Sequence, residues 1–191
     1  MNLPNRLTLL RIALSFVLIV CLLTPGFGAK LAAALVFTVA SLTDLWDGRL
    51  ARSRGLVTDF GILMDPIADK ILVLSAFVAF VQLGVAPAWM VVLIATREFL
   101  VTGLRLFALG KGQVLPAEAA GKHKTASQMV AISLTLLFLP FREMMTTRSG
   151  GEDWIAAGEV GIWYLMLLTV ILTLTSGISF FWKHRKLIFN L

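Results

Sequence analysis

The chain has 191 residues, of which 58% are hydrophobic and 15% charged, and its mean hydropathy is +0.88. Because a soluble domain is nearer half apolar and about a quarter charged, this composition excludes a soluble enzyme, a secreted disulfide scaffold and a disordered protein. The 17 Lys and Arg residues outnumber the 11 Asp and Glu residues. The resulting net charge of +6 favours anionic lipids or phosphate-bearing substrates over nucleic acid as partners.

The only cysteine and the two histidines indicate no chemistry of their own. Cys21 cannot form an intrachain disulfide, and it lies in an apolar run where it serves as a small hydrophobic filler. The two His residues form no metal-binding tract. We therefore expect neither a redox function nor a histidine metal site.

Six apolar runs follow one another along the chain, each about as long as a helix needs to cross a bilayer. They lie at residues 7–23, 31–52, 61–83, 87–108, 125–141 and 158–182. The first run could be taken for a signal peptide, but five more follow it and no clear cleavage site ends it, so we expect a retained helix. The sequence predicts an all-α membrane bundle of six transmembrane helices, formed by a single domain over residues 1–191.

The basic residues predict how the bundle is oriented. With the N-terminus in the cytoplasm, the loops at 49–54 and 111–124 and the tail at 183–186 lie inside. The outer side then keeps only Lys30, Arg142 and Arg148, with Arg97 left aside in mid-span. This distribution follows the positive-inside rule and places both termini in the cytoplasm.

Acidic residues gather where the second run ends and the third begins. Five of the six Asp residues fall within residues 44–69: Asp44, Asp47, Asp59, Asp65 and Asp69. Residues three or four apart share one face of a helix, so Asp44 lies beside Asp47, and Asp65 beside Asp69. We expect the loop at 53–60 to fold the two runs into an antiparallel hairpin that holds these four carboxylates at similar depth.

Four carboxylates so placed repel one another or take up protons unless a cation neutralises them. Oxygen ligands favour Mg²⁺ or Mn²⁺ over zinc, and four carboxylates can hold two ions that clamp a phosphoryl group. The alternative is that these residues are helix caps or solvated loop charges, which suits Asp59. It suits the other four poorly, because the second run is too short to span unless it continues through Asp47. Whether Asp65 begins a helix or lies at a kink beside Pro66 stays open.

Small residues accompany the acids. Gly48 and Gly61 allow a ligand to approach the backbone. Ala51 lies on the same helix face as Asp44, and its small side chain takes up little space there. The planar guanidinium of Arg52 has paired N–H donors that suit a diphosphate. The alternative for the two glycines is close packing between spanning helices.

These residues together form a recognisable motif. The segment Asp44-x2-Asp47-Gly48-x2-Ala51-Arg52-x8-Gly61-x3-Asp65-x3-Asp69 resembles the signature of the CDP-alcohol phosphotransferase family at every fixed position. Other stretches resemble the branch of that family that uses glycerol-3-phosphate: residues 2–8 with Arg11, 57–61, 97–99 with 103–105, and 121–125. The resemblance covers residues 1 to about 130, and the last two runs match only in hydropathy.

The resemblance implies a fold, an activity and a location. The fold is a six-helix membrane bundle, usually a homodimer, in the bacterial cytoplasmic (inner) membrane with its active site facing the cytoplasm. The implied reaction transfers the phosphatidyl group of CDP-diacylglycerol to sn-glycerol-3-phosphate and yields phosphatidylglycerophosphate and CMP.

The resemblance also implies roles for single residues. Two divalent cations, Mg²⁺ or Mn²⁺, would be bound by Asp44, Asp47, Asp65 and Asp69. Asp69 would also be the general base. The site for the CDP moiety would be shaped by Gly48, Ala51, Arg52 and Gly61.

A phosphorylated acceptor needs cations separate from the metal ions. We predict that Arg105, Lys122 and Lys124 bind the acceptor phosphate, with Arg97 as a further candidate. The alternatives are that the two lysines meet anionic lipid headgroups, and that Arg97 forms a structural buried pair with Glu98.

Other functions compete with this interpretation. An ion-coupled transporter also carries intramembrane carboxylates, but it generally has a repeat and midplane sites, neither of which the sequence indicates. A non-enzymatic scaffold does not account for four acids in register. Within the family, the alternative acceptors are inositol phosphate, phosphatidylglycerol and serine, and the basic set argues against serine.

Overall fold

The protein is a bundle of long helices. The computed structural model describes residues 3–54, 59–112, 119–146, 148 and 150–189. The helices are α1 (Leu3–Leu23), α2 (Phe27–Arg54), α3 (Asp59–Gln82), α4 (Ala88–Gly110), α5 (Ala119–Met145) and α6 (Gly151–Phe189). Since these ranges contain no strand, the predicted all-α class is confirmed for them.

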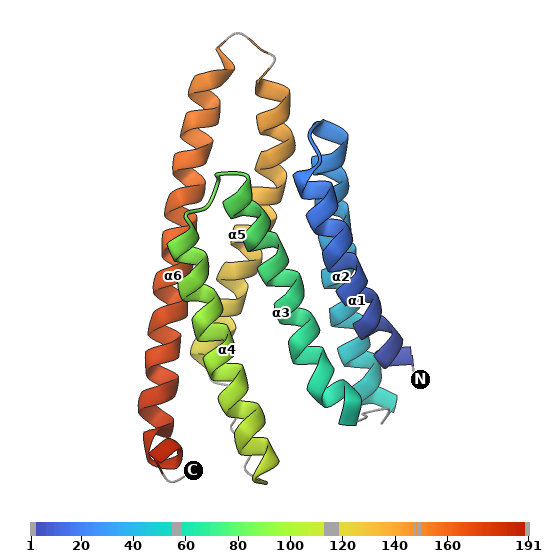
Figure 1. Ribbon diagram of the computed structural model, residues 1–191, viewed down its shortest axis with the longest axis vertical. Helices are drawn as coiled ribbons and strands as arrows, with labels where there is room; N and C mark the ends of the chain where they lie inside the picture. The colour runs from blue at the N-terminus through green and yellow to red at the C-terminus, as the bar shows by residue number, and fades with distance from the viewer. Residues whose placement is uncertain (1–2, 55–58, 113–118, 147, 149, 190–191) are drawn as a thin grey trace.

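The helices run up and down the long axis of an elongated molecule (Figure 1). α1 packs against both α2 and α3, α5 packs against α2 and α6, and α4 packs against α3 and α6. The two ends of the chain lie at the same end of the bundle (Figure 1). At the opposite end, the α5–α6 hairpin reaches beyond the other helices.

The distribution of apolar side chains is that of a protein surrounded by lipid. The interior is closed by large side chains such as Leu18, Phe77 and Phe80, none of which is exposed. The outer surface is apolar too, with Phe16 64% exposed and Trp182 68% exposed. A soluble protein rarely presents apolar surface so widely, so the chain is a membrane protein.

Within the described residues, four helices are long and apolar enough to cross a membrane, judged by length and composition. These stretches are Asn5–Leu23, Phe27–Asp44, His123–Met145 and Gly151–Arg185. α3 and α4 do not meet that criterion because α3 carries Asp65, Asp69 and Lys70, and α4 carries Arg97, Glu98 and Arg105.

The helices extend past the apolar runs that predicted them. The segments at 49–54 and 183–186, expected in a loop and a tail, lie within α2 and α6, and Lys122 and Lys124 lie within α5. The prediction was wrong there because backbone hydrogen bonds, which hold a helix together, do not require apolar side chains. At its 39 residues α6 is about 58 Å long, almost twice the hydrocarbon thickness of about 30 Å.

One further expectation needs correction. α2 and α3 are antiparallel, but they contact each other little, because α1 lies against both. Lys30, which the sequence assigns to the outer side of the membrane, is 3% exposed, and its Nζ donates hydrogen bonds to the carbonyls of Leu22 and Thr24 (3.0 Å to the latter). The lysine therefore satisfies carbonyls that the end of α1 leaves without helical partners.

Candidate functional site

One turn of α1 contacts the acids of both neighbouring helices. Arg11 is fully buried, and its guanidinium lies 2.7 Å from Oδ1 of Asp44 on α2. Thr8, one turn earlier and also fully buried, donates a hydrogen bond of 2.5 Å to Oδ1 of Asp65 on α3. The carboxylates that the sequence assigns to two separate helices thus meet on one face of a third.

Asp65 lies within α3 rather than at its start. The helix begins at Asp59 and runs through Pro66, so the question left open by the sequence is answered in favour of a helical position. Gly61 is buried in the first turns of the same helix. Pro66 lies past the first turn, so its missing N–H leaves one helical hydrogen bond unmade; spanning helices accept such a proline where neighbouring groups satisfy the freed carbonyl.

Asp69 begins a row of alternating charges that crosses from α3 to α5. The Lys70 ammonium lies 3.4 Å from Oδ2 of Asp69 and 2.8 Å from Oε2 of Glu98 on α4. Oε1 of Glu98 in turn contacts the ammonium of Lys124 on α5. Asp69 is 39% exposed at its side chain, whereas Glu98 is 1% exposed.

Glu98 is the most heavily engaged group of this row. Besides the two lysines, its Oε1 accepts a hydrogen bond of 3.2 Å from Nε2 of Gln128 and lies 3.6 Å from the Arg97 guanidinium. Arg97 also donates a hydrogen bond of 2.7 Å to Oγ of Ser176 on α6. The sequence predicted a buried pair of Arg97 with Glu98, and the structure adds two lysines and an amide to it.

A polar pocket of about 450 Å³ opens beside Glu98. Its charged lining consists of Lys70, Arg97, Glu98, Arg105 and Lys124. Two of the three residues predicted for an acceptor phosphate, Arg105 and Lys124, thus share one pocket. The pocket carries four cationic side chains against one anionic side chain, which suits an anionic ligand.

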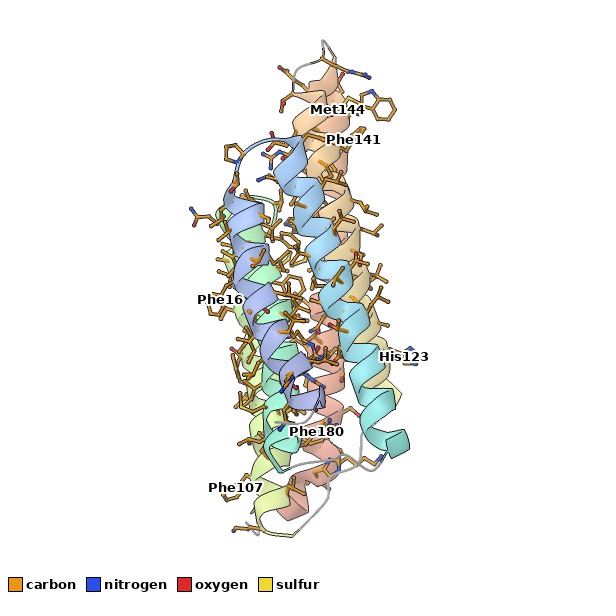
Figure 2. The ribbon with its side chains drawn as sticks, turned by 90° about the vertical axis from the view of Figure 1, so that its right-hand side faces the viewer. Phe16, Phe107, His123, Phe141, Met144 and Phe180 are labelled. Atoms are coloured by element: carbon orange, nitrogen blue, oxygen red, sulfur yellow. The ribbon has the colours of Figure 1, made fainter. Side chains whose placement is uncertain are left out.

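Among the described residues, Arg105 stacks on an aromatic ring and forms no ion pair. Its guanidinium lies 5.2 Å over the Phe180 ring, and no partner among the described residues accepts a hydrogen bond from its buried Nε. Phe180 and His123, the neighbour of Lys124, lie in the lower half of the molecule in Figure 2, away from Phe141 and Met144. That half contains both ends of the chain (Figure 1).

Some predicted site residues lie outside the described side chains. They are Asp47, Gly48, Ala51 and Arg52 on α2 and Lys122 on α5. Among the side chains that are described, no three His, Cys, Asp or Glu residues come together as a metal site. The described carboxylates of the motif nevertheless offer oxygen donors of the kind that Mg²⁺ and Mn²⁺ prefer.

Four residues of the site were not assigned a role from the sequence. Thr8, Arg11, Lys70 and Gln128 each contact one of the acids. A signal was present for two of them, since Arg11 and Lys70 are charges inside apolar runs and such charges are rarely idle. Thr8 and Gln128 carry no comparable signal, because a hydroxyl or an amide is common in spanning helices.

Comparisons with known proteins agree with the motif. A family model described as CDP-alcohol phosphatidyltransferase matches residues 1–182. The CDP-diacylglycerol--glycerol-3-phosphate 3-phosphatidyltransferase of Bacillus subtilis is 41% identical over 196 residues, which cover 96% of this chain and 95% of the relative. The protein of that name from Rickettsia bellii is 39% identical, with 97% and 96% covered. A probable phosphatidylglycerophosphate synthase of Mycobacterium tuberculosis is 40% identical, with 94% of this chain and 79% of the relative covered.

Proposed function

Because this chain belongs to the CDP-alcohol phosphatidyltransferase family and is therefore a transferase, we propose that it transfers the phosphatidyl group of CDP-diacylglycerol to sn-glycerol-3-phosphate. The products are phosphatidylglycerophosphate and CMP. Relatives that are 41% and 39% identical carry the name of this activity. The observation that carries the proposal is the cationic pocket next to Asp69.

The charge of the pocket favours a phosphorylated acceptor. Lys70, Arg97, Arg105 and Lys124 give it three more positive than negative charges once Glu98 is counted. A phosphate monoester carries up to two negative charges near neutral pH and matches this surplus, whereas serine has no net charge. Phosphatidylglycerol offers one negative charge, and inositol phosphate fits as well as glycerol-3-phosphate by charge alone. The relatives' names decide between the two phosphomonoesters.

The metal ions are a proposal supported by donor chemistry. Asp44, Asp65 and Asp69 would hold them together with Asp47, in agreement with the motif. When bound, two divalent cations would neutralise the diphosphate of the nucleotide lipid and the charge on departing CMP. Arg11 and Thr8 hold the carboxylates of Asp44 and Asp65 against the same part of α1.

The reacting hydroxyl needs a proton acceptor. The 1-hydroxyl of glycerol-3-phosphate attacks the phosphorus that bears the diacylglycerol, a new P–O bond forms, and the P–O bond to CMP breaks. Asp69 accepts the hydroxyl proton in the proposed step, because its partly exposed carboxylate is joined to the cationic pocket through Lys70. Arg105 and Lys124 bind the acceptor phosphate.

The proposed setting is a bacterial cytoplasmic membrane with six spans and both termini in the cytoplasm. α3 and α4 would then span with their charges paired inside the bundle, as the contacts of Lys70 and Glu98 suggest. Both the ends of the chain and the polar pocket belong to one half of the molecule. The homodimer that the motif implies stays a prediction.

The test is release of CMP from CDP-diacylglycerol by the purified protein in detergent. Glycerol-3-phosphate, inositol phosphate, phosphatidylglycerol and serine are supplied in separate reactions with Mg²⁺ or Mn²⁺. We expect release with glycerol-3-phosphate alone, and we expect chelation of the metal or Asp69→Asn to abolish it. Release with serine or phosphatidylglycerol instead would contradict the proposed acceptor, and full activity in excess chelator would contradict the proposed metal ions.

A further inference from the structure

The buried carboxylate of Glu98 lies between two of the cations that line the polar pocket. Each of its oxygens contacts a different lysine, Oε2 that of Lys70 and Oε1 that of Lys124. The two lysines come from α3 and α5, whereas Glu98 belongs to α4. One side chain therefore fixes cations from two other helices.

Glu98 lies at the wall of the pocket, but its partners cover nearly all of its side chain. It is 1% exposed, and Gln128 and Arg97 complete its contacts. A buried carboxylate is costly unless it is paired and hydrogen-bonded, and Glu98 has both kinds of partner. An anion so fully surrounded is unsuited to touching a substrate itself.

The cations would behave differently without it. Four positive side chains around 450 Å³ repel one another, and long lysine side chains can turn away from such a pocket. Lys70 has a second acid within 3.4 Å, Asp69, to which it can shift when Glu98 loses its charge. Such a shift would take one cation out of the pocket and place it on the proposed proton acceptor.

We propose that Glu98 is a positioning residue for the acceptor, which holds Lys70 and Lys124 where they can bind the phosphate monoester and keeps Lys70 from pairing closely with Asp69. This inference rests on the proposed function, since it names the residue that organises the acceptor pocket of the same reaction. It assigns Glu98 no contact with the substrate.

The experiment compares variants of the full-length protein by steady-state CMP release. We expect Glu98→Gln to raise the apparent KM for glycerol-3-phosphate about tenfold, as for one lost charge-assisted contact. The KM for CDP-diacylglycerol should stay within about twofold, because the lysines that Glu98 contacts line the acceptor pocket. A mere loss of folded enzyme would change neither KM. Glu98→Asp, which keeps the charge on a shorter side chain, should lie between wild type and Glu98→Gln.

A control removes an acid that is paired with a cation elsewhere on the molecule. Glu159 lies 3.3 Å from the Arg142 guanidinium, on the α5–α6 pair and outside the lining of the pocket. Glu159→Gln should leave both KM values unchanged. An equal change in the two KM values for Glu98→Gln, or no change in either, would overturn the inference.

A double variant keeps the test decisive if Glu98→Gln alone folds poorly. The double variant combines Glu98→Gln with Lys124→Gln. It replaces this ion pair by two neutral side chains, so neither charge is left buried without the other. If Glu98 acts through Lys124, the double variant should have nearly the same KM for glycerol-3-phosphate as Lys124→Gln, because effects within one interacting unit are not additive. Additive increases would overturn the inference.

A failure of the proposed function would be recognised separately. If wild-type protein released CMP only with an acceptor other than glycerol-3-phosphate, the proposed acceptor would be wrong. The role of Glu98 would then be tested by adding inorganic phosphate, which should raise the Tm of the wild-type protein more than that of Glu98→Gln. Equal increases, or none, would overturn the inference as well.

Discussion

The three described acids of the motif each have a partner of a different kind. Asp44 lies against a buried arginine, Asp65 accepts a hydrogen bond from a buried threonine, and Asp69 lies near a lysine that is shared with Glu98. Side chains that orient a metal ligand commonly affect metal affinity as strongly as a weak ligand does. Thr8 is a direct case, because its hydroxyl donates a hydrogen bond to the carboxylate of Asp65.

We predict that Thr8→Val weakens the use of Mg²⁺. The substitution keeps the shape of the side chain and removes the donor to Asp65, so the metal concentration for half-maximal CMP release should rise about tenfold. Titration of Mg²⁺ against the initial rate measures this. Thr38→Val is the control, because the exposed Thr38 hydroxyl donates a hydrogen bond to the carbonyl of Ala34 in its own helix. An unchanged titration curve for Thr8→Val would contradict the role of Thr8.

The acids could be predicted from the sequence, but their partners could not. The spacing of Asp44, Asp65 and the other acids repeats with the helical turn, which is a local pattern visible in one segment. The bond from Thr8 to Asp65 joins residues 57 apart. Nothing local distinguishes this hydroxyl from others, so the pairing appears only when α1 packs against α3.

At the scale of the elements, length was the least predictable property. The apolar runs located the helices, but α5 begins at Ala119 rather than near residue 125, and α6 continues to Phe189. Hydropathy indicates which residues suit the lipid interior. The hydrogen-bonded helix can extend beyond them until a turn residue or a change of direction ends it. This difference placed Lys122 and Lys124 in a loop when the backbone there is helical.

The contact between α5 and α6 gives a prediction at this scale. A Cβ added to Gly158 of α6 would overlap the ring of Phe138 on α5, whereas one added to Gly161 meets nothing. We expect Gly158→Ala to destabilise the protein by about 1–3 kcal/mol through overpacking.

Gly161→Ala is the matched control in the same helix. It should be neutral or slightly stabilising, because alanine favours a helix more than glycine does. The Tm of the purified protein in detergent measures both changes. Equal Tm values for the two variants would contradict close packing at Gly158, and Phe138→Leu should restore part of the Tm lost by Gly158→Ala.

At the scale of the whole molecule, the bundle has two chemically different ends. One holds the ends of the chain and the polar pocket, and the other holds the projecting α5–α6 hairpin with Arg148. The sequence predicted this division from its basic residues, which are concentrated toward one side. The orientation relative to the cytoplasm follows from the same rule and can be measured directly.

We predict that Arg148 faces the outside of the cell and Lys111 the cytoplasm. Cys21 is the only cysteine, so Cys21→Ala gives a background in which Arg148→Cys or Lys111→Cys is the single thiol. Both positions are exposed. A membrane-impermeant maleimide should label Arg148→Cys in intact cells and Lys111→Cys only after permeabilisation. The reverse pattern would invert the proposed topology.

The contacts of α1 bear on the order in which the chain is made. α1 precedes α2 and α3 in the chain and therefore leaves the ribosome before either acid-bearing helix. Arg11 and Thr8 are thus already made when Asp44 and Asp65 arrive. Glu98 also has a partner that is made before it, since Lys70 precedes it in the chain and Lys124 follows it. Each carboxylate can thus find its first partner during insertion, so the costly exposure of a lone charge to lipid need not outlast the synthesis of one helix.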